Sequence, residues 1–268
     1  SKGIEIESTD SYNISNNIDE NVAGIAAQAM LKNIDIDFGF KIVINKGIKP
    51  GSGIGSSAAS SAGTVYAINQ LLNSHFDNID LVRFSMEGEN FVSGSYHADN
   101  VAPIILGGIT LVRSISDMDI IKLPSPKSLE VIIIRPNIEI KTSDSRRVVK
   151  KKVKIEKMVQ QSANLGAFIS SLYSEDFELM SRSVVDEVVE PDRSMLIPEF
   201  ESIKKISIES GALSCGISGS GPSIFALSNN SKTSKIILNN ICSHLDKVNI
   251  DYDSFISKVN PKGIKILD

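Results

Sequence analysis

The 268-residue sequence contains no tryptophan, only two cysteines and only three histidines. Cys215 and Cys242 show no CxxC spacing, which favours two reduced thiols over a disulfide framework or a zinc site. No apolar run is long enough to cross a bilayer, because the longest, residues 101–112, is broken by Pro103 and two glycines. The first residues lack the charged-then-apolar pattern of a secretory signal. Together these absences predict a cytoplasmic protein.

The sequence also lacks an excess of charge of either sign. It has 28 Lys and Arg against 32 Asp and Glu, for a formal net charge of −4. This balance provides no field that attracts nucleic acid or an anionic membrane, and we expect neither as a partner. The 41% of hydrophobic residues is typical of an ordered globular chain. An anionic ligand would therefore need a local site of backbone N–H groups, a metal ion or a few cations.

Hydrophobic periodicity predicts strands and helices without a strict βαβ rhythm, which favours an α+β fold. Strands are expected at residues 4–6, 38–45, 107–113, 129–135, 213–217, 223–227 and 251–266. Helices are expected at residues 20–32, 56–72, 80–92, 143–149, 155–173, 176–185, 199–210 and 234–245. Asn17 or Asp19 is the expected cap of the first helix, and residues 94–103 are expected to be irregular. The residues from Pro124 to Pro126 indicate a junction between two lobes, and the basic stretch Lys150–Lys154 is typical of a solvated helix face.

A glycine-rich loop at residues 50–59, Pro-Gly-Ser-Gly-Ile-Gly-Ser-Ser-Ala-Ala, is the most informative segment. Glycines allow positive φ and let backbone N–H groups approach a ligand closely. The helix that follows presents unpaired N–H groups and the positive end of its dipole, where a phosphate fits. The alternative is a glycine-rich turn with ordinary serine caps.

Two common nucleotide-binding motifs fit this loop poorly. A Walker A motif is excluded, because no lysine follows Gly55. The letters Gly53-x-Gly55-x-x-Ala58 satisfy the dinucleotide fingerprint, but that fingerprint also needs a second strand that ends in an acid about twenty residues on. Asp77 stands at that distance but follows a predicted helix, so a nicotinamide enzyme is disfavoured.

The loop resembles the second motif of the GHMP kinases, P-x-x-x-G-L-G-S-S-A, with Ile54 in the leucine position. Residues 214–223, Ser-Cys-Gly-Ile-Ser-Gly-Ser-Gly-Pro-Ser, resemble the third motif of that family. The resemblance implies an α+β, two-lobed GHMP kinase fold. Residues 1–126 would form an ATP-binding, ribosomal-protein-S5-domain-2-like N-terminal lobe, incomplete at its start, and residues 127–268 a ferredoxin-like C-terminal lobe.

Three further segments resemble the homoserine kinase branch of the family. They are the stretch from Glu89 to Pro103, the sequence Glu190-Pro191-x-Arg193, and Thr142 followed by Arg146. This resemblance implies ATP-dependent phosphorylation of the L-homoserine hydroxyl to O-phospho-L-homoserine, in threonine biosynthesis. Homoserine and ATP are then the expected partners, and a homodimer is allowed for.

The resemblance also implies residue roles. Ser57 and Glu89 would hold Mg²⁺, a hard ion that prefers oxygen ligands, whereas without the motif Glu89 reads as a surface acid. The implied ATP contacts are Asn21, Val22, Lys46, Lys49, Pro50, Gly51, Ser52, Gly53, Ile54, Gly55, Ser56, Ser57, Ala58 and Ala59. The implied substrate contacts are His97, Thr142, Arg146, Arg193, Gly219 and Ser220.

Asn100 and Asp99 are the implied catalytic residues. An amide cannot accept a proton at neutral pH, so we expect Asn100 to orient the hydroxyl or to stabilise the transferring charge rather than to act as a base. Guanidinium groups suit the carboxylate of homoserine, a zwitterion. For the arginines the alternative is a surface ion pair, and for His97 it is a structural role.

The first motif of the family, A-x-S/T-x-N-L-G-x-G-F-D, is not found where it is expected. The letters Ser162–Gly166 imitate part of it, but they lie inside a predicted helix. We therefore expect a complete kinase of this kind to carry further strands before Ser1. The alternatives are a GHMP kinase for another small alcohol, such as shikimate or mevalonate, and a non-catalytic nucleotide-binding remnant. Asn100 and the two arginines argue against mevalonate.

Overall fold

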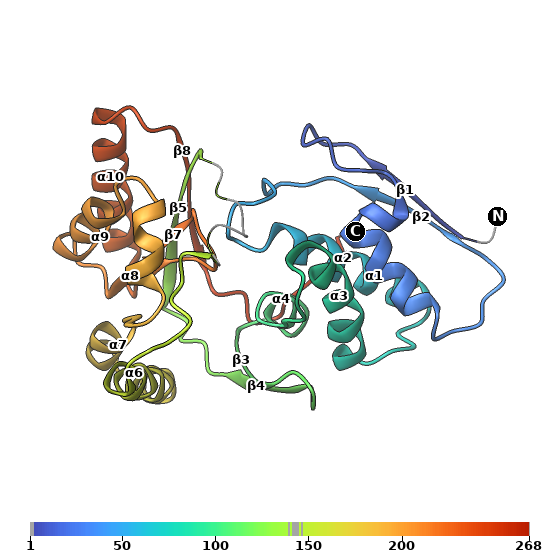
Figure 1. Ribbon diagram of the computed structural model, residues 1–268, viewed down its shortest axis with the longest axis horizontal. Coiled ribbons are helices and arrows are strands. Elements are labelled where there is room, and N and C mark those ends of the chain that lie inside the picture. The colour runs from blue at the N-terminus through green and yellow to red at the C-terminus, as the bar shows by residue number, and fades with distance from the viewer. Residues whose placement is uncertain (1–2, 139, 141–144, 146, 268) are drawn as a thin grey trace. The chain divides into compact units, whose positions relative to one another are not determined.

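The computed structural model describes residues 3–138, 140, 145 and 147–267, which divide into two compact units (Figure 1). The first unit comprises the chain up to Pro50, Gly55–Lys122 and the tail from Asn260, and the second comprises Gly51–Ile54 and Leu123–Val259. The predicted boundary after residue 126 differs from this division in three segments, the first of which is residues 123–126, which belong to the second unit. Part of the glycine loop belongs to the second unit, and the C-terminal tail belongs to the first.

Helices form the core of the first unit. The helices α1 (Val22–Leu31), α2 (Ser56–Leu71) and α3 (Asn78–Ser93) pack on one another, together with the short helix α4 (Val101–Leu106). Their shared core contains Ala26, Ala27, Met30, Ala58, Ala62, Val65, Leu81, Val82 and Ala102, all buried. Small residues allow this close packing, because a Cβ atom on Gly88 of α3 would lie only 2.6 Å from the carbonyl oxygen of Val22.

Two short sheets complete the first unit. Strand β1 (Ile4–Ser8) pairs in parallel with β2 (Phe40–Ile44), and β3 (Ile109–Ser114) pairs with β4 (Asp119–Leu123). Strand β4 was not predicted. The predicted cap of the first helix was also wrong. Asn17 caps a 3₁₀ turn, η1 (Ile18–Glu20), whereas α1 is capped by Asn21, whose side chain accepts a hydrogen bond from the N–H of Ala23.

The second unit is built on a four-stranded antiparallel sheet in the order β6-β7-β5-β8. Its strands are β5 (Glu130–Pro136), β6 (Ser214–Ile217), β7 (Ile224–Ser228) and β8 (Tyr252–Lys258). Between β5 and β6 lie α6 (Ile155–Ser174), α7 (Phe177–Ser183), α8 (Glu190–Arg193), η2 (Ser194–Leu196) and α9 (Phe200–Glu209). Helix α10 (Ser231–Lys247) connects β7 to β8. This β-α-β-β-α-β order is the ferredoxin-like arrangement.

One face of this sheet carries the core of the second unit. Helices α9 and α10 lie against it (Figure 1) and bury Ile132, Ile134, Ile203, Ile237 and Ile241. Strand β5 alternates buried and half-buried residues along its whole length, as a strand with one core face should. The sheet and its two helices therefore form a self-contained hydrophobic core.

Two predicted segments differ from the structure, and a third lies partly outside the described residues. The expected strand at residues 251–266 ends at Lys258, because the tail instead accepts a hydrogen bond from Gly108 at Asn260 and donates one from Ile264 to Ile104. The expected irregular segment 94–103 contains the start of α4, where Pro103 is tolerated in the first turn. The short helix α8 was not predicted, and residues 143, 144 and 146 of the helix expected at residues 143–149 lie outside the described residues.

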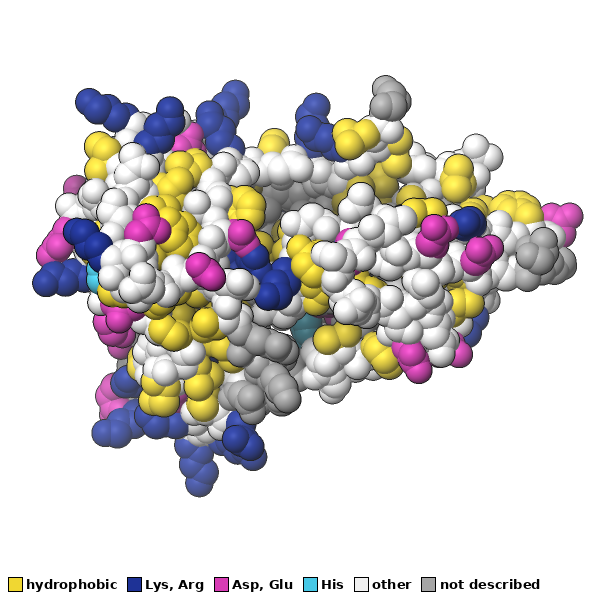
Figure 2. Space-filling view, turned by 90° about the horizontal axis from the view of Figure 1, so that it is seen from above, with side chains coloured by type: hydrophobic (Ala, Val, Ile, Leu, Met, Phe, Trp, Pro, Cys, Tyr) yellow, Lys and Arg dark blue, Asp and Glu magenta, His cyan; other side chains and the backbone are white. Residues whose placement is uncertain are grey.

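The surface carries no dominant charge on the face shown in Figure 2, where Lys and Arg side chains are interspersed with Asp and Glu. Among the described residues, no helix is both long and apolar enough to span a membrane.

The packing around Gly88 predicts opposite effects of the same substitution at two helical glycines. We expect Gly88→Ala to lower the free energy of unfolding by about 1–3 kcal/mol, because its methyl group would overlap the Val22 carbonyl. We expect Gly63→Ala in α2 to raise it by up to about 1 kcal/mol, because a Cβ atom there has no neighbour within 4 Å. Thermal unfolding of both variants checks this. Equal shifts in the midpoint would show that close packing at Gly88 is unimportant.

Candidate active site

The glycine loop is anchored by its backbone to the segment that resembles the third motif. The hydroxyl of Ser218 donates a hydrogen bond of 3.0 Å to the carbonyl of Gly53, and the hydroxyl of Ser223 donates one of 2.6 Å to the carbonyl of Ser52. Gly53 has a φ of +78°, and a Cβ atom there would lie 2.5 Å from the carbonyl oxygen of Gly221. Two motifs that are 165 residues apart in the sequence are thus in direct contact within the second unit.

The loop ends at the N-terminus of α2. Gly55 occupies the N-cap position with a φ of +78°, and no side chain caps the helix. The first intrahelical bond runs from the N–H of Ala59 to the carbonyl of Gly55. The N–H groups of Ser56, Ser57 and Ala58 therefore have no acceptor within the helix, and they lie at the positive end of its dipole. The N–H of Ala59 is already used, and the side chain of Ala58 is buried in the helical core.

Lys46 lies beside the start of α2. Its ammonium group donates to the carbonyl of Ser56 at 3.0 Å and to the Ser56 hydroxyl at 3.3 Å. Partial burial lowers the pKa of Lys46, while the charges of Asp10 and Glu89 act in the opposite direction. A cavity of about 410 Å³ adjoins this lysine, lined by β2 and by the small and apolar side chains of α2. The cavity is therefore largely apolar with a cation at its edge.

Glu89 on α3 is the most unusual acid of the first unit. Its side chain is buried at 5% exposure, and Oε1 has no hydrogen-bond partner among the described residues. Burial raises the pKa of Glu89, while a hydrogen bond with Ser57 and the nearby His97 lower it. A buried carboxylate oxygen without a partner costs stability unless a ligand satisfies it. The structure thus brings together the two predicted metal ligands and leaves one of their oxygens to be satisfied.

His97, Asp99 and Asn100 follow α3 in a polar segment. The Nδ1 atom of His97 lies 2.9 Å from the Asp99 carboxylate, and its Nε2 atom lies 3.0 Å from the Ser93 hydroxyl. The hydrogen bond with His97 lowers the pKa of Asp99. Asn100 stands at the N-cap of α4 but makes no side-chain cap hydrogen bond. Its amide oxygen instead lies 3.5 Å from where a Cβ atom of Gly55 would be, beside the start of α2.

Arg193 of α8 is held against the third-motif segment. Its Nε atom donates to the carbonyl of Ser145 at 3.2 Å, and one terminal N–H group donates to the carbonyl of Gly219 at 3.0 Å. The hydroxyl of Ser145 in turn donates to the carbonyl of Ser220 at 2.9 Å. Three predicted substrate contacts of the second unit therefore lie together, joined by Ser145, a buried residue that the sequence patterns did not indicate. Thr142 and Arg146 lie outside the described residues.

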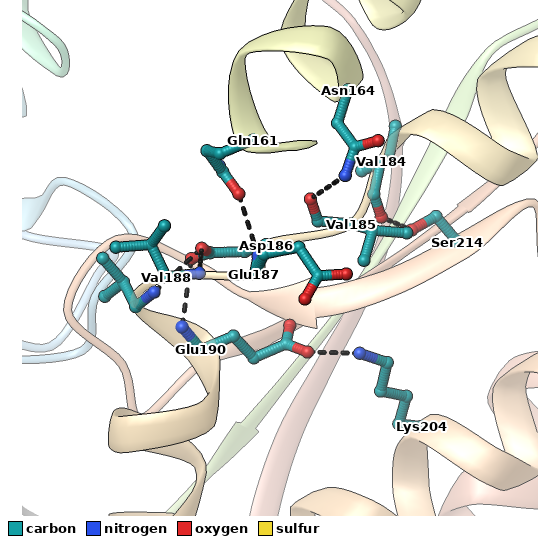
Figure 3. A network of polar contacts seen from close by, with 11 residues as sticks. Gln161, Asn164, Val184, Val185, Asp186, Glu187, Val188, Glu190, Lys204 and Ser214 are labelled. Carbon is teal, nitrogen blue, oxygen red and sulfur yellow. Dashed lines mark hydrogen bonds and ion pairs between the residues drawn. The ribbon is translucent and has the colours of Figure 1, made fainter. Parts of the chain in front are cut away.

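A network of polar contacts fixes the helix that carries Arg193 (Figure 3). The carboxylate of Asp186 accepts hydrogen bonds from the N–H groups of Val188, Val189 and Glu190 at the start of α8. Gln161 and Asn164 of α6 bind the backbone of the same segment. Glu190 forms an ion pair with Lys204 of α9, although burial raises the pKa of Glu190. Apart from Glu190, which begins the Glu190-Pro191-x-Arg193 segment, these supporting residues form no recognisable motif in the sequence.

Asn21 and Val22, two of the predicted ATP contacts, have structural roles at the start of α1. The side chain of Asn21 is almost fully buried, accepting from Ala23 and donating to the carbonyl of Ser15 at 2.7 Å. Val22 is the first residue of α1, and its carbonyl faces Gly88. The two residues therefore define the start of α1.

Comparison with known proteins agrees with these features. Residues 21–108 match the family described as GHMP kinases N terminal domain, and residues 168–247 match GHMP kinases C terminal. The chain is 39% identical over 239 residues to a homoserine kinase of Chlorobium phaeobacteroides, an alignment that covers 88% of this chain and 74% of the relative. It is also 39% identical to the homoserine kinase of Methanococcus maripaludis, with 84% of this chain and 74% of that protein covered.

Solved structures show the same relationship. The crystal structure of homoserine kinase from Cytophaga hutchinsonii superimposes with a TM-score of 0.94 at 42% identity, covering 98% of this chain and 84% of that one. The mevalonate kinase of L. major shares the fold alone, with a TM-score of 0.72 at 16% identity, over 97% of this chain and 83% of that one. The two family matches, the identity to the curated relatives and the close structural agreement show that the chain belongs to the homoserine kinase family of the GHMP kinases.

Proposed function

We propose that the chain transfers the γ-phosphoryl group of ATP to the side-chain hydroxyl of L-homoserine and releases O-phospho-L-homoserine and ADP, in threonine biosynthesis. The observation that carries this proposal is the buried Oε1 atom of Glu89, which has no hydrogen-bond partner among the described residues and lies next to Ser57, where the glycine loop leads into α2. The sequence identity of the chain to a homoserine kinase supports the choice of substrate. Cys215 and Cys242 are free thiols, which supports the expected cytoplasmic location.

The phosphates of ATP would bind the backbone around the glycine loop. The N–H groups of Ser56, Ser57 and Ala58 have no acceptor within α2 and lie where the helix dipole favours an anion. Glycines 51, 53 and 55 all have positive φ and carry no side chain, so the backbone at these positions can approach a ligand closely. Lys46 would stabilise the start of α2 and contribute a positive charge close to it, and the apolar cavity beside Lys46 has a volume suited to a ligand of adenosine size.

Mg²⁺ would be held by Glu89 and Ser57. Two hard oxygen donors make these residues suitable for the ion. One is Oε1 of Glu89, which has no partner among the described residues, and the other is the hydroxyl of Ser57, which lies next to that carboxylate. No group of three or more His, Cys, Asp and Glu side chains is arranged around a metal position in the described part of the chain. Such a sparse donor set suits Mg²⁺, which usually binds one or two protein groups together with water and substrate phosphates. When bound, the ion would neutralise charge on the β- and γ-phosphates.

Homoserine would be bound through its charged groups. The guanidinium of Arg193 is oriented by the carbonyls of Ser145 and Gly219, and we assign it to the substrate carboxylate. Thr142, Arg146, His97 and Ser220 remain proposed contacts. Asn100 would hold the hydroxyl in position, because its amide is not used as a helix cap and cannot accept a proton.

The reaction then depends on placement rather than on a strong base. The substrate hydroxyl oxygen would form a bond to the γ-phosphorus as the bond to the β-phosphate bridging oxygen breaks, and the hydroxyl proton would leave with solvent or phosphate. Asp99 has a lowered pKa because of His97, so it is a weak proton acceptor and serves mainly to hold that histidine. Fixed N–H donors and correct orientation would supply most of the rate.

The proposed activity predicts selective turnover. We expect MgATP-dependent ADP release with L-homoserine, measured in a coupled assay, and little or none with shikimate or mevalonate, because these hydroxy acids carry a carboxylate but lack the α-ammonium group of homoserine and differ from it in shape. Turnover with another alcohol instead would identify a different GHMP kinase. Nucleotide binding without turnover would favour a non-catalytic remnant.

Glu89→Gln tests the metal site with a readout other than activity. Burial raises the pKa of Glu89, so folding favours the protonated carboxyl group. The charged carboxylate therefore destabilises the folded state. This cost is absent at low pH, grows as the carboxyl titrates, and is fully present once the pH has risen through the raised pKa. We therefore expect the metal-free variant to unfold at a higher temperature than the parent protein at pH 8, with the difference vanishing near pH 4. Activity should fall by about 100-fold or more.

The Glu89 proposal has a matched control. Glu87, two residues away on the same helix, is half-buried and accepts a hydrogen bond from the hydroxyl of Tyr96. Glu87→Gln should leave the pH profile of stability, the Mg²⁺ response and activity nearly unchanged. A Glu89→Gln variant whose thermal midpoint is no higher than that of the parent protein at any pH would contradict the buried-charge argument.

Arg193→Leu tests the substrate contact. We expect the KM for L-homoserine to rise by about 30-fold or more while the KM for ATP changes less than about threefold, because one charge-assisted pair contributes roughly 2 kcal/mol or more. Steady-state kinetics with each substrate varied in turn measures both constants. Similar changes in the two constants would instead show that Arg193 acts by holding the third-motif segment.

A further inference from the structure

The short helix α4 carries Asn100 at its start but cannot hold its own position. It has six residues, and Asn100 stands at its N-cap without using its side chain there. A helix of this length is unstable in isolation, because so few hydrogen bonds do not offset the entropy lost on ordering the chain. Tertiary contacts must therefore decide where α4 lies. Val101, Ala102 and Ile105 provide some of them by packing into the core of the first unit.

The carbonyls at the other end of α4 are bound by segments that are distant in the sequence. The N–H group of Ile264, in the C-terminal tail, donates a hydrogen bond of 2.9 Å to the carbonyl of Ile104. The ammonium group of Lys122 on β4 donates to the carbonyl of Leu106 at 2.6 Å and to that of Pro261 in the tail at 3.0 Å. This lysine therefore links the end of the helix to the tail, and its charge complements the negative end of the helix dipole.

Two glycines let the tail lie directly against the end of α4, which the red end of the chain reaches in Figure 1. A Cβ atom on Gly107, just after the helix, would overlap the backbone nitrogen of Gly263. A Cβ atom on Gly263 would lie only 2.6 Å from the carbonyl oxygen of Ile104. Both glycines also have positive φ, which other residues rarely adopt. A side chain at either position would therefore push the tail away from the helix.

Asn260 shapes the tail where it meets the helix. Its side chain donates a hydrogen bond of 2.8 Å to the carbonyl of Gly263, which closes a turn. Its own carbonyl accepts a hydrogen bond of 2.7 Å from the N–H group of Gly108. We call residues 260–264 and Lys122 the clasp, because together they bind the C-terminal end of α4.

The opposite end of α4 presents Asn100 to the start of α2. The Asn100 amide oxygen lies 3.5 Å from the place that a Cβ atom of Gly55 would occupy, and the N–H groups assigned to phosphate begin at Ser56. Helix α4 is about 9 Å long, so a shift at the clasp would reach Asn100 through fewer than two helical turns. A displacement of about 1 Å in a positioning group can lower a rate by about 100-fold.

We propose that the clasp is a positioning device for Asn100, with Lys122 as its central residue. By binding the carbonyls at the C-terminal end of α4, the clasp sets the position of the helix and thereby holds the Asn100 amide beside Gly55. The tail and Lys122 then affect the reaction without touching the substrate. This inference rests on the proposed function for the role of Asn100, whereas the contacts of the clasp are independent of that function.

Lys122→Met tests the clasp in steady-state kinetics of the full chain. We expect kcat with L-homoserine to fall by about tenfold while the KM for ATP changes less than about twofold, because the backbone that binds phosphate stays in place. Lys122→Arg keeps donors for both carbonyls and should restore kcat to within about threefold of the parent value. Lys265→Met is the matched control, since Lys265 is an exposed lysine of the same tail outside the clasp, and it should leave kcat unchanged.

A double-mutant cycle with Asn100→Ala separates positioning from general stability. If Lys122 acts through Asn100, Lys122→Met should lower kcat by less than about twofold in a chain that already carries Asn100→Ala. Losses that multiply in the double variant would overturn the proposal, as would a Lys122→Met variant with the kcat of the parent protein. A parent protein that turns over no L-homoserine would instead contradict the proposed function.

Hydrogen exchange supplies a readout that needs no turnover. The N–H groups of Ala102 and Ile104 are bound to carbonyls of the preceding turn, so their exchange reports on the stability of α4. We expect them to exchange about tenfold faster in Lys122→Met than in the parent protein or in Lys265→Met, while the amides of α2 keep their rates. Equal exchange in α4 would show that the clasp does not hold the helix, and faster exchange in α2 as well would show general destabilisation. Either result would overturn the proposal.

Discussion

The hydrogen bonds that hold the glycine loop are the constraint on which the candidate site depends. Two serine hydroxyls from the third-motif segment, Ser218 and Ser223, bind consecutive loop carbonyls, and Gly53 fits there only because it lacks a side chain. With these carbonyls satisfied, the backbone of Ser52 and Gly53 is held within the second unit before any ligand binds. A loop that is already ordered reduces the entropy that binding must overcome.

The first unit holds two charged groups in unfavourable surroundings. Glu89 is buried with one oxygen unpartnered, and burial lowers the pKa of Lys46. Each of these costs stability in the isolated chain, and each would be relieved by a cation or an anionic ligand nearby. In the second unit, the carbonyls of Ser145 and Gly219 orient Arg193, and Lys204 forms an ion pair with Glu190.

Long periodic elements and dense motifs were predictable because their signals are local. The helices of the first unit, β5 and the glycine loop follow from residues close together in the sequence, and two motifs with a few subfamily residues indicated the family. Elements that depend on distant partners were not predictable in the same way. Strand β4 is a short strand paired with β3, and the tail after Lys258 leaves the sheet because its hydrogen bonds go to Ile104 and Gly108. The cap of α1 was misplaced by a 3₁₀ turn that no periodicity reveals.

The sequence by itself determined the fold class, the order of elements and the chemical character of the site, because residue type and spacing are enough to define a glycine loop, a helix and a charged group. Only the tertiary structure decided which groups meet. It placed the Glu89 carboxylate beside Ser57, bonded Arg193 to the carbonyl of Gly219, and linked Arg193 to Ser220 through Ser145. These outcomes depend on close packing between residues far apart in the chain, and a one-dimensional pattern contains no distance between them.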